Sequence, residues 1–467
     1  MTDNFYILTL DWLTNSPLLA TATEAATESD AEQGTLVLAG VLLSLVVIYF
    51  ASQLGGELCS RINLPPVLGQ LVGGVLIGIS AFRLLVFPET NIAEDSLIID
   101  LLQSTAGLPS ETAPSVFAAQ SEVISLLSEL GVIILLFEIG LESDLKELIR
   151  VGPIAAVVAV VGVVAPFVSG TLGLIYIFGT PAVPAIFAGA ALTATSIGIT
   201  AKVLAELGQL SSEEGQIIIG AAVLDDILGI VVLAVVASLV KTGEIQISNI
   251  IYLVISAAVF LIGSIVIGRL ISPLIVGLVN EMKTRGEVLL TGLVFAFILS
   301  YIATAIHLEG ILGAFAAGLI LAETDKRKEL EEQIIPVADF FVPVFFVCVG
   351  AKTDLSVLNP AVPSNREGLI IATFLILVAI LGKVITGFTV FGNPDLNKLA
   401  IGVGMIPRGE VGLVFAGVGS ASGALSEATE AAIIVMVITT TFVAPPLLRL
   451  VFQEKEVVTE SVDKVRE

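Results

Sequence analysis

Long runs of apolar residues, separated by short polar stretches, dominate the chain after an acidic, Thr- and Ala-rich stretch over 1–34. Thirteen such segments follow, and most are long enough to span a bilayer, since about 20 apolar residues suffice for a membrane-crossing helix. Their approximate bounds are 35–57, 66–86, 121–142, 150–178, 183–206, 214–241, 248–279, 287–306, 309–323, 334–351, 367–391, 397–420 and 428–451. The pattern predicts an all-α polytopic membrane protein with about thirteen transmembrane helices, all within a membrane domain over 35–452.

Three regions lie outside this pattern. We interpret 1–34 as an acidic, non-cytoplasmic N-terminal tail and 453–467 as a short cytoplasmic tail. The one long insertion, 87–120, carries five acidic residues and no Lys or Arg, so we expect a polar loop there. Asp339, beside two prolines at the start of segment 334–351, is expected to cap a helix.

The composition narrows the class of protein. The 467 residues are 56% hydrophobic and 14% charged, whereas soluble domains carry about 25% charged residues. Cys59 and Cys348 lie on separate apolar segments, and His307 is the one histidine, so neither a zinc cluster nor a multi-histidine metal site is expected. Nothing resembles a dinucleotide fingerprint or a P-loop, so we expect no cofactor, no nucleotide-driven pump and no nucleic-acid binding.

Basic residues indicate the orientation. With the N-terminus outside, four basic residues (Arg83, Lys241, Lys352 and Arg366) face outward, two (Lys383 and Arg408) lie within segments, and the other fifteen of 21 face the cytoplasm. This distribution fits the positive-inside rule. We therefore expect a non-cytoplasmic N-terminus and a cytoplasmic C-terminus.

The chain contains an internal repeat. Residues 64–74 (LPPVLGQLVGG) match 308–318 (LEGILGAFAAG) at an offset of 244, and 140–145 (GLESDL) match 350–355 (GAKTDL) at an offset of 210. The difference of 34 equals the length of the polar insertion. Because the copies are seven segments apart, they have opposite orientations, which predicts inverted repeats over about 64–241 and 308–451, a transporter architecture. Chance similarity of glycine-rich segments is the alternative.

Two adjacent carboxylates, Asp225 and Asp226, lie within the apolar run 216–240. A charged residue at the middle of a bilayer costs about 2.5–3.5 kcal/mol even on the most permissive scale, and packing alone gives no reason for two. The pair therefore predicts an ion or proton site with a cationic partner. Lys383, near the middle of segment 367–391, is the candidate, although a lysine can also extend along a short helix to the membrane surface.

Segment 183–206 carries hydroxyl residues at its centre, where a continuous helix is weakest: Thr193, Thr195 and Ser196. Its repeat mate, 397–420, is interrupted at the equivalent place by the sequence Pro-Arg-Gly-Glu. Discontinuous helices at matching positions of two repeats point to a transporter's binding site. Ordinary helix packing, with each hydroxyl bonded back to a preceding carbonyl, is the alternative for the threonines.

Charged residues accompany the second interruption. Arg408 and Glu410 lie two residues apart within an apolar segment. The ends of half-helices carry partial charges, and we expect these two side chains to compensate them. Glu138, within segment 121–142, could line a funnel toward the site or play a hydrogen-bonded structural role.

Six motifs, taken in order along the chain, indicate a resemblance to one family. These motifs are NLPPVLGQ at 63–70, GVIILLFEIGLESD at 131–144, LTATS at 192–196, LDDILG at 224–229, Lys383, and PRGE at 407–410. Over about 35–450 the chain is similar to the monovalent cation:proton antiporters, in the branch of NapA-like and Kef-like transporters, and looks most like cyanobacterial sodium/proton antiporters. It lacks the long nucleotide-binding region that follows the last helix of Kef-like systems, so we expect no regulation of that kind.

The resemblance implies a fold and roles for several residues. A core domain, built from segments four to six and eleven to thirteen, would move against a dimerisation domain in a homodimer embedded in lipid. Asp226 would bind the cation, and Asp225 would pair with Lys383. Thr193, Thr195 and Ser196 would lie beside the ion, and the protein would serve pH homeostasis and sodium tolerance.

The expected activity is therefore electrogenic exchange of Na⁺ (or Li⁺) for H⁺ by alternating access, with Na⁺ bound at Asp226. K⁺/H⁺ exchange, or K⁺ efflux on the same fold, is the alternative. An intramembrane aspartyl protease is disfavoured because adjacent residues of one helix point about 100° apart, so no enzyme activity is expected. A bacterial inner membrane and a cyanobacterial thylakoid both fit.

Overall fold

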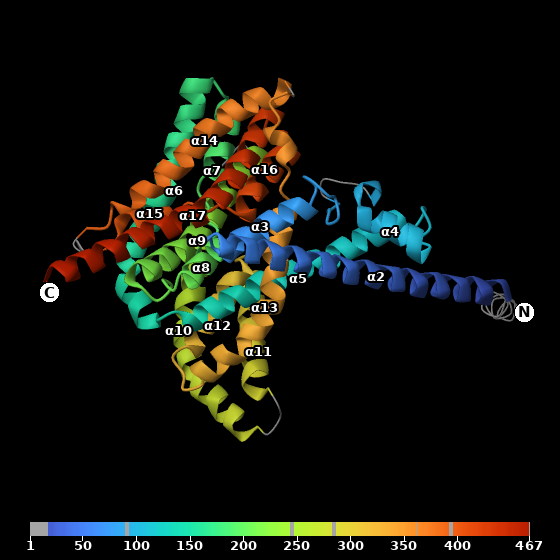
Figure 1. Cartoon of the computed structure of the whole chain (residues 1–467), viewed down its shortest axis with the longest axis horizontal. Helices are drawn as coiled ribbons and strands as arrows, with labels where there is room; N and C mark the ends of the chain where they lie inside the picture. The colour runs from blue at the N-terminus through green and yellow to red at the C-terminus, as the bar shows by residue number, and fades with distance from the viewer. Residues whose placement is uncertain are drawn as a thin grey trace, which may run out of the picture.

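The computed structural model describes residues 17–88, 93–242, 247–282, 286–361, 363–391 and 396–466, and every regular element in these ranges is a helix (Figure 1). Nine helices within them are long and apolar enough to cross a membrane, and shorter apolar helices lie between these. The all-α polytopic prediction is confirmed.

The first half of the chain holds α2 (Pro17–Arg61), α3 (Pro66–Ile77), η1 (Ala93–Asp95), α4 (Leu97–Ala106), α5 (Ala113–Glu142), α6 (Leu145–Phe178), α7 (Ala182–Ala191), α8 (Ile197–Glu206) and α9 (Glu213–Thr242). The second half holds α10 (Ile247–Glu281), α11 (Glu287–Ala305), α12 (Gly310–Leu321), α13 (Arg327–Ala351), η2 (Leu355–Leu358), α14 (Pro363–Gly387), α15 (Lys398–Gly404), α16 (Glu410–Ala421) and α17 (Glu427–Arg466). Each predicted segment coincides with one of these helices, or with the pairs α7–α8 and α15–α16.

Several predicted boundaries are wrong. The helix of segment 66–86 stops at Ile77, because Gly78 adopts an extended conformation and the chain turns back on the end of α3. The insertion is not a plain loop, because α4 forms there with the Ser96 hydroxyl accepting the Ile99 N–H at its start. Asp339 lies in the interior of α13, so it does not cap that helix, and α17 continues to Arg466.

The repeat is visible in two glycine contacts. A Cβ placed on Gly74 of α3 would lie 2.9 Å from the Cα of Gly350 on α13, and one on Gly140 of α5 would lie 3.0 Å from the Cα of Gly318 on α12. The repeat offset of 244 relates Gly74 to Gly318, and the offset of 210 relates Gly140 to Gly350, so the two contacts are equivalent. Each pair lets two helices approach more closely than side chains allow.

The helices form two groups by their packing. In Figure 1, α6, α7, α14 and α16 of one group lie at the top, whereas α10 to α13 of the other lie at the bottom and α2 runs to the right. The core group is α6 to α9 with α14 to α17, in which α6 packs on α9, α14 on α17, and α6 on α14. The scaffold group is α2, α3, α5 and α10 to α13, in which α3 packs on α2 and α13, and α12 on α11 and α5. Helix α8 also contacts α3 and α5, so it lies at the boundary between the groups.

The glycine contacts make a prediction for stability. Gly140→Ala should lower the thermal unfolding midpoint in detergent, because its methyl group would overlap the backbone of α12 at a cost of roughly 1–3 kcal/mol. Gly263→Ala on α10 is the matched control, since a Cβ there meets nothing within 4 Å and alanine favours a helix by about 0.5–1 kcal/mol. Equal midpoints for the two variants would contradict the packing described.

Candidate functional site

The first interrupted helix is broken over 192–196, between α7 and α8. The Thr193 hydroxyl bonds back to the carbonyl of Ala190 at 2.7 Å, which competes with continuation of α7. Ser196 then takes an extended conformation and starts α8. The hydroxyl of Thr193 thus follows the ordinary helix-packing alternative, and the break leaves its carbonyl free of any helical partner.

The second break, over 405–409, lies directly against the first. The Ser196 N–H donates to the Pro407 carbonyl at 2.8 Å, and the Thr195 hydroxyl donates to the Met405 carbonyl at 3.1 Å. Thr200, on α8, donates to the Gly404 carbonyl at 2.9 Å. Because a break in an apolar layer leaves backbone groups without helical partners, each broken helix supplies the bonds that the other has lost.

Arg408 connects the two broken helices through hydrogen bonds. Its side chain is fully buried, and Nη1 donates to the carbonyls of Thr193 (3.1 Å) and Ala194, at the C-terminal end of α7. A guanidinium there compensates the partial negative charge of the helix end. Its Nε and Nη2 have no hydrogen-bond partner within the described residues. The side chain of Glu410, the other residue predicted for this role, lies outside the described part of the structure.

Asp225 on α9 and Lys383 on α14 form an ion pair with both side chains fully buried. The lysine Nζ donates to both carboxylate oxygens, at 3.2 and 3.1 Å. Gly162 on α6 makes room for the ammonium group, since a Cβ there would lie 3.2 Å from Nζ. Lys383 therefore does not extend to the membrane surface.

Two further charges lie within electrostatic reach of this pair. Arg408 interacts with Asp225 and Lys383, and Asp226 interacts with Lys383. When all four are ionised, two carboxylates balance two cations, so a change in the charge of any one alters the energy of the other three.

Asp226 lines a small cavity in addition to its place beside the ion pair. The cavity offers about 10 Å³ to the centre of a water molecule, on the order of what one water or one dehydrated ion requires. Its lining residues are Ala194, Thr195, Ser196, Ile197, Asp226, Glu309, Ile311, Gly409 and Val411. Asp226, Thr195 and Ser196 therefore line one cavity, whereas Thr193 is not among its lining residues.

Glu138 lies at a second, larger cavity of about 440 Å³ between α5, α13 and the end of α8. Glu142, Glu331 and Glu332 also line it, with Arg327 as the basic residue. Arg327 donates to Glu331 at 2.6 Å and to the Glu142 carbonyl at 3.2 Å. Glu138 therefore lies in an acidic cavity, at the face that the positive-inside rule predicts to be cytoplasmic.

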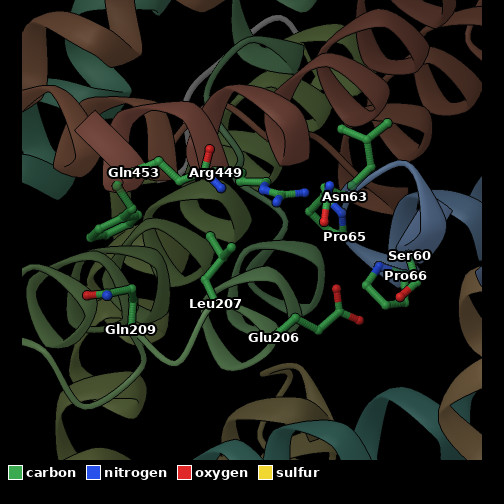
Figure 2. Close-up of a pocket in the computed structure, with 11 residues that line it drawn as sticks. Ser60, Asn63, Pro65, Pro66, Glu206, Leu207, Gln209, Arg449 and Gln453 are labelled. Atoms are coloured by element: carbon green, nitrogen blue, oxygen red, sulfur yellow. The ribbon is translucent and has the colours of Figure 1, made fainter. Parts of the chain in front are cut away.

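A third cavity, of about 340 Å³, separates α8 and α17 from the start of α3 (Figure 2). Glu206 points across it toward Pro66, and its carboxylate accepts the Val67 N–H at 3.4 Å. Arg449 and Gln453 extend into it from α17. Sequence reasoning missed both Glu206 and Glu309, because each looks like an ordinary polar residue at a helix end.

Comparison with known proteins shows the family of the chain. Residues 26–454 match the family model described as "Sodium/hydrogen exchanger, transmembrane". The high-affinity Na⁺/H⁺ antiporter NhaS3 of Synechocystis is 76% identical over 94% of each chain. The Na⁺/H⁺-K⁺ antiporter GerN of Bacillus cereus is 32% identical over 88% of this chain and 96% of its own.

The fold also has a solved counterpart. The sodium proton antiporter MjNhaP1 from Methanocaldococcus jannaschii aligns with a TM-score of 0.55, covering 91% of this chain and 97% of that one. At 17% identity the likeness concerns the fold alone. It agrees with the helical architecture described above.

The buried ion pair predicts a pattern of stability in variants. Asp225→Asn and Lys383→Met should each lower the unfolding midpoint, because removal of one partner leaves an uncompensated buried charge, at a cost of about 3–5 kcal/mol. The double variant should recover much of the loss, since no lone charge then remains. Thermal unfolding in detergent measures this cycle, and strictly additive losses would contradict the pairing.

Proposed function

Because the chain belongs to the sodium/hydrogen exchanger family, we propose that it exchanges Na⁺ or Li⁺ for H⁺ across a membrane by alternating access. The observation that carries this proposal is the water-sized cavity lined by Asp226, the residue next to Asp225 of the buried Asp225–Lys383 pair. A buried carboxylate in a water-sized cavity inside an apolar layer has the chemistry of an ion site.

Exchange follows from competition for one carboxylate. Asp226 ligates a cation only when it is ionised, and proton binding removes that ability, so H⁺ and Na⁺ exclude each other. The hydroxyls of Thr195 and Ser196 line the same cavity, and oxygen atoms are the ligands that hard cations prefer. Arg408, which draws the Thr193 and Ala194 carbonyls together, is proposed to fix the crossing beside the ion.

Alternating access requires the site to face each side in turn. The cavity lies between the groups: Asp226 and the two breaks belong to the core group, whereas Glu309 and Ile311 belong to the scaffold group. A movement of the core group against the scaffold group would open it to one side and then the other. The acidic cavity at Glu138 would attract cations on the cytoplasmic side.

The proposed exchange is electrogenic. Lys383 and Asp226 together offer two groups that could release protons when one cation binds. If more protons than cations move in each cycle, net charge crosses the membrane. The pairing of Lys383 with Asp225 would be lost when the lysine releases its proton and restored when it regains one.

K⁺ is the second candidate cation. The name of GerN includes K⁺, and the fold alone does not select one ion. We favour Na⁺ because the relative that is 76% identical over 94% of each chain is named a high-affinity Na⁺/H⁺ antiporter.

We also propose the arrangement in the cell. The N-terminus would be outside, the C-terminus cytoplasmic, and the scaffold group would form a homodimer within the lipid. A bacterial inner membrane or a cyanobacterial thylakoid would hold the protein. The role there would be pH homeostasis and sodium tolerance.

The function is tested by dissipation of a pH gradient in proteoliposomes on addition of Na⁺, Li⁺ or K⁺. The wild type should respond to Na⁺ and Li⁺, and Asp226→Asn should lose the response, because the amide cannot alternate between proton and cation. Glu111→Gln, at a surface position remote from the site, is the control. A K⁺-only response would change the assigned substrate, and normal transport by Asp226→Asn would show that the site is wrong.

Electrogenicity is tested in the same vesicles with an imposed membrane potential. A potential that drives the excess positive charge in the direction of proton movement should accelerate Na⁺/H⁺ exchange, and the reversed potential should slow it. Rates that do not depend on the potential would show electroneutral exchange.

A further inference from the structure

We propose that Glu309 is a second carboxylate of the cation path, which receives the cation at the side of the cavity opposite Asp226. This inference rests on the proposed exchange function and assigns to it a residue outside the Asp-Asp-Lys set. Glu309 precedes α12 and lines the same small cavity as Asp226, Thr195 and Ser196.

The two carboxylates belong to different groups of helices. Asp226 is carried by α9 in the core group, while Glu309 is carried by α12, which packs on α11, α5 and α10 of the scaffold group. The cavity is therefore closed on one side by the crossing breaks and on the other by the start of α12. A relative movement of the two groups would change the separation of Glu309 and Asp226.

Glu309 lies at the N-terminal end of a helix. It occupies the N-cap position of α12 with an extended backbone (φ −71°, ψ 136°), and the N-terminus of a helix carries partial positive charge that stabilises an anion. A cation in the cavity would then have a carboxylate in each wall. Ionised carboxylates on two sides attract a cation more strongly than one does.

The two copies of the repeat differ at this position, so the carboxylate before the short helix occurs in only one of them. At the offset of 244, the position equivalent to Glu309 is Pro65, at the start of α3. The carboxylate found there is Glu206, which comes from α8 of the core group and accepts the Val67 N–H. Thus the scaffold group has a carboxylate at the N-cap of α12 (Glu309) and a proline at the N-cap of α3 (Pro65).

The consequence is a difference between the two sides of the membrane. A cation that enters past α12 would meet Glu309 before Asp226, and a cation that enters at the α3 end would not. Removal of the Glu309 charge should therefore weaken the apparent affinity for Na⁺ on the α12 side. It should leave the maximal rate and the other side nearly unchanged.

The experiment measures Na⁺-dependent proton movement in vesicles of each orientation, over a range of Na⁺ concentrations. Glu309→Gln should raise the half-saturating Na⁺ concentration on the α12 side by roughly three- to tenfold. Glu309→Asp should restore most of the affinity, because it keeps the charge. Glu427→Gln is the matched control, since Glu427 is an exposed carboxylate in the first turn of α17, outside the cavity lining.

Three results would overturn the proposal: an unchanged half-saturating concentration in Glu309→Gln, an equal change on both sides, or a fall in maximal rate alone. A purely structural role would also lower the unfolding midpoint, which is measured on the same preparations. The wild-type measurement tests the proposed function, and the comparison with Glu309→Gln tests only the role of Glu309. If the wild type exchanges Na⁺ for H⁺ and Glu309→Gln behaves identically, only the Glu309 assignment fails.

Discussion

The buried pair of Asp225 and Lys383 constrains everything around it. Removing a carboxylate and an ammonium from water costs several kcal/mol for each ion, and only close contact with good geometry recovers that cost. The structure provides the contact by holding α9 and α14 together, with Gly162 of α6 leaving the space that the ammonium occupies. Since both partners have no exposed surface, neither can change its charge without a response from its neighbours. Because the charges of the pair and its neighbours depend on one another, binding or release of a proton or cation at one group affects the others, as an exchanger requires.

The two broken helices bring these charges to one place. A break in each helix removes backbone hydrogen bonds, and the crossing restores them between residues more than 200 positions apart, such as Ser196 and Pro407. Arg408 links the crossing to the ion pair, because it donates hydrogen bonds at the end of α7 and interacts electrostatically with Asp225. The crossing therefore connects the geometry of the backbone with the charge of the site. A shift in one break would displace Arg408, and with it the balance of the four charges.

The sequence predicted the parts of this arrangement that have a strong pattern. Charges in an apolar run are rare enough to identify Asp225, Asp226 and Lys383, and the hydropathy pattern located the spans because a bilayer demands continuous apolar stretches. The details that failed depend on backbone angles or on packing partners. The hydroxyl of Thr193 turns back to Ala190 because of the local conformation of the break. Segment 66–86 remains apolar after α3 has ended at Ile77, so hydropathy could not mark its end.

The internal repeat could be predicted, but its chemical asymmetry could not. Glycines at 74, 140, 318 and 350 recur because two helix pairs must approach closely, so geometry preserves them in both halves. The residues that precede the two short helices, Pro65 and Glu309, are not part of these glycine contacts. A proline or a glutamate can each begin a helix, and so Pro65 and Glu309 diverge while their neighbours remain alike. An exchanger built from two inverted halves would treat both sides of the membrane equally if the halves were identical. Positions outside the glycine contacts are therefore where a difference between the two faces can arise.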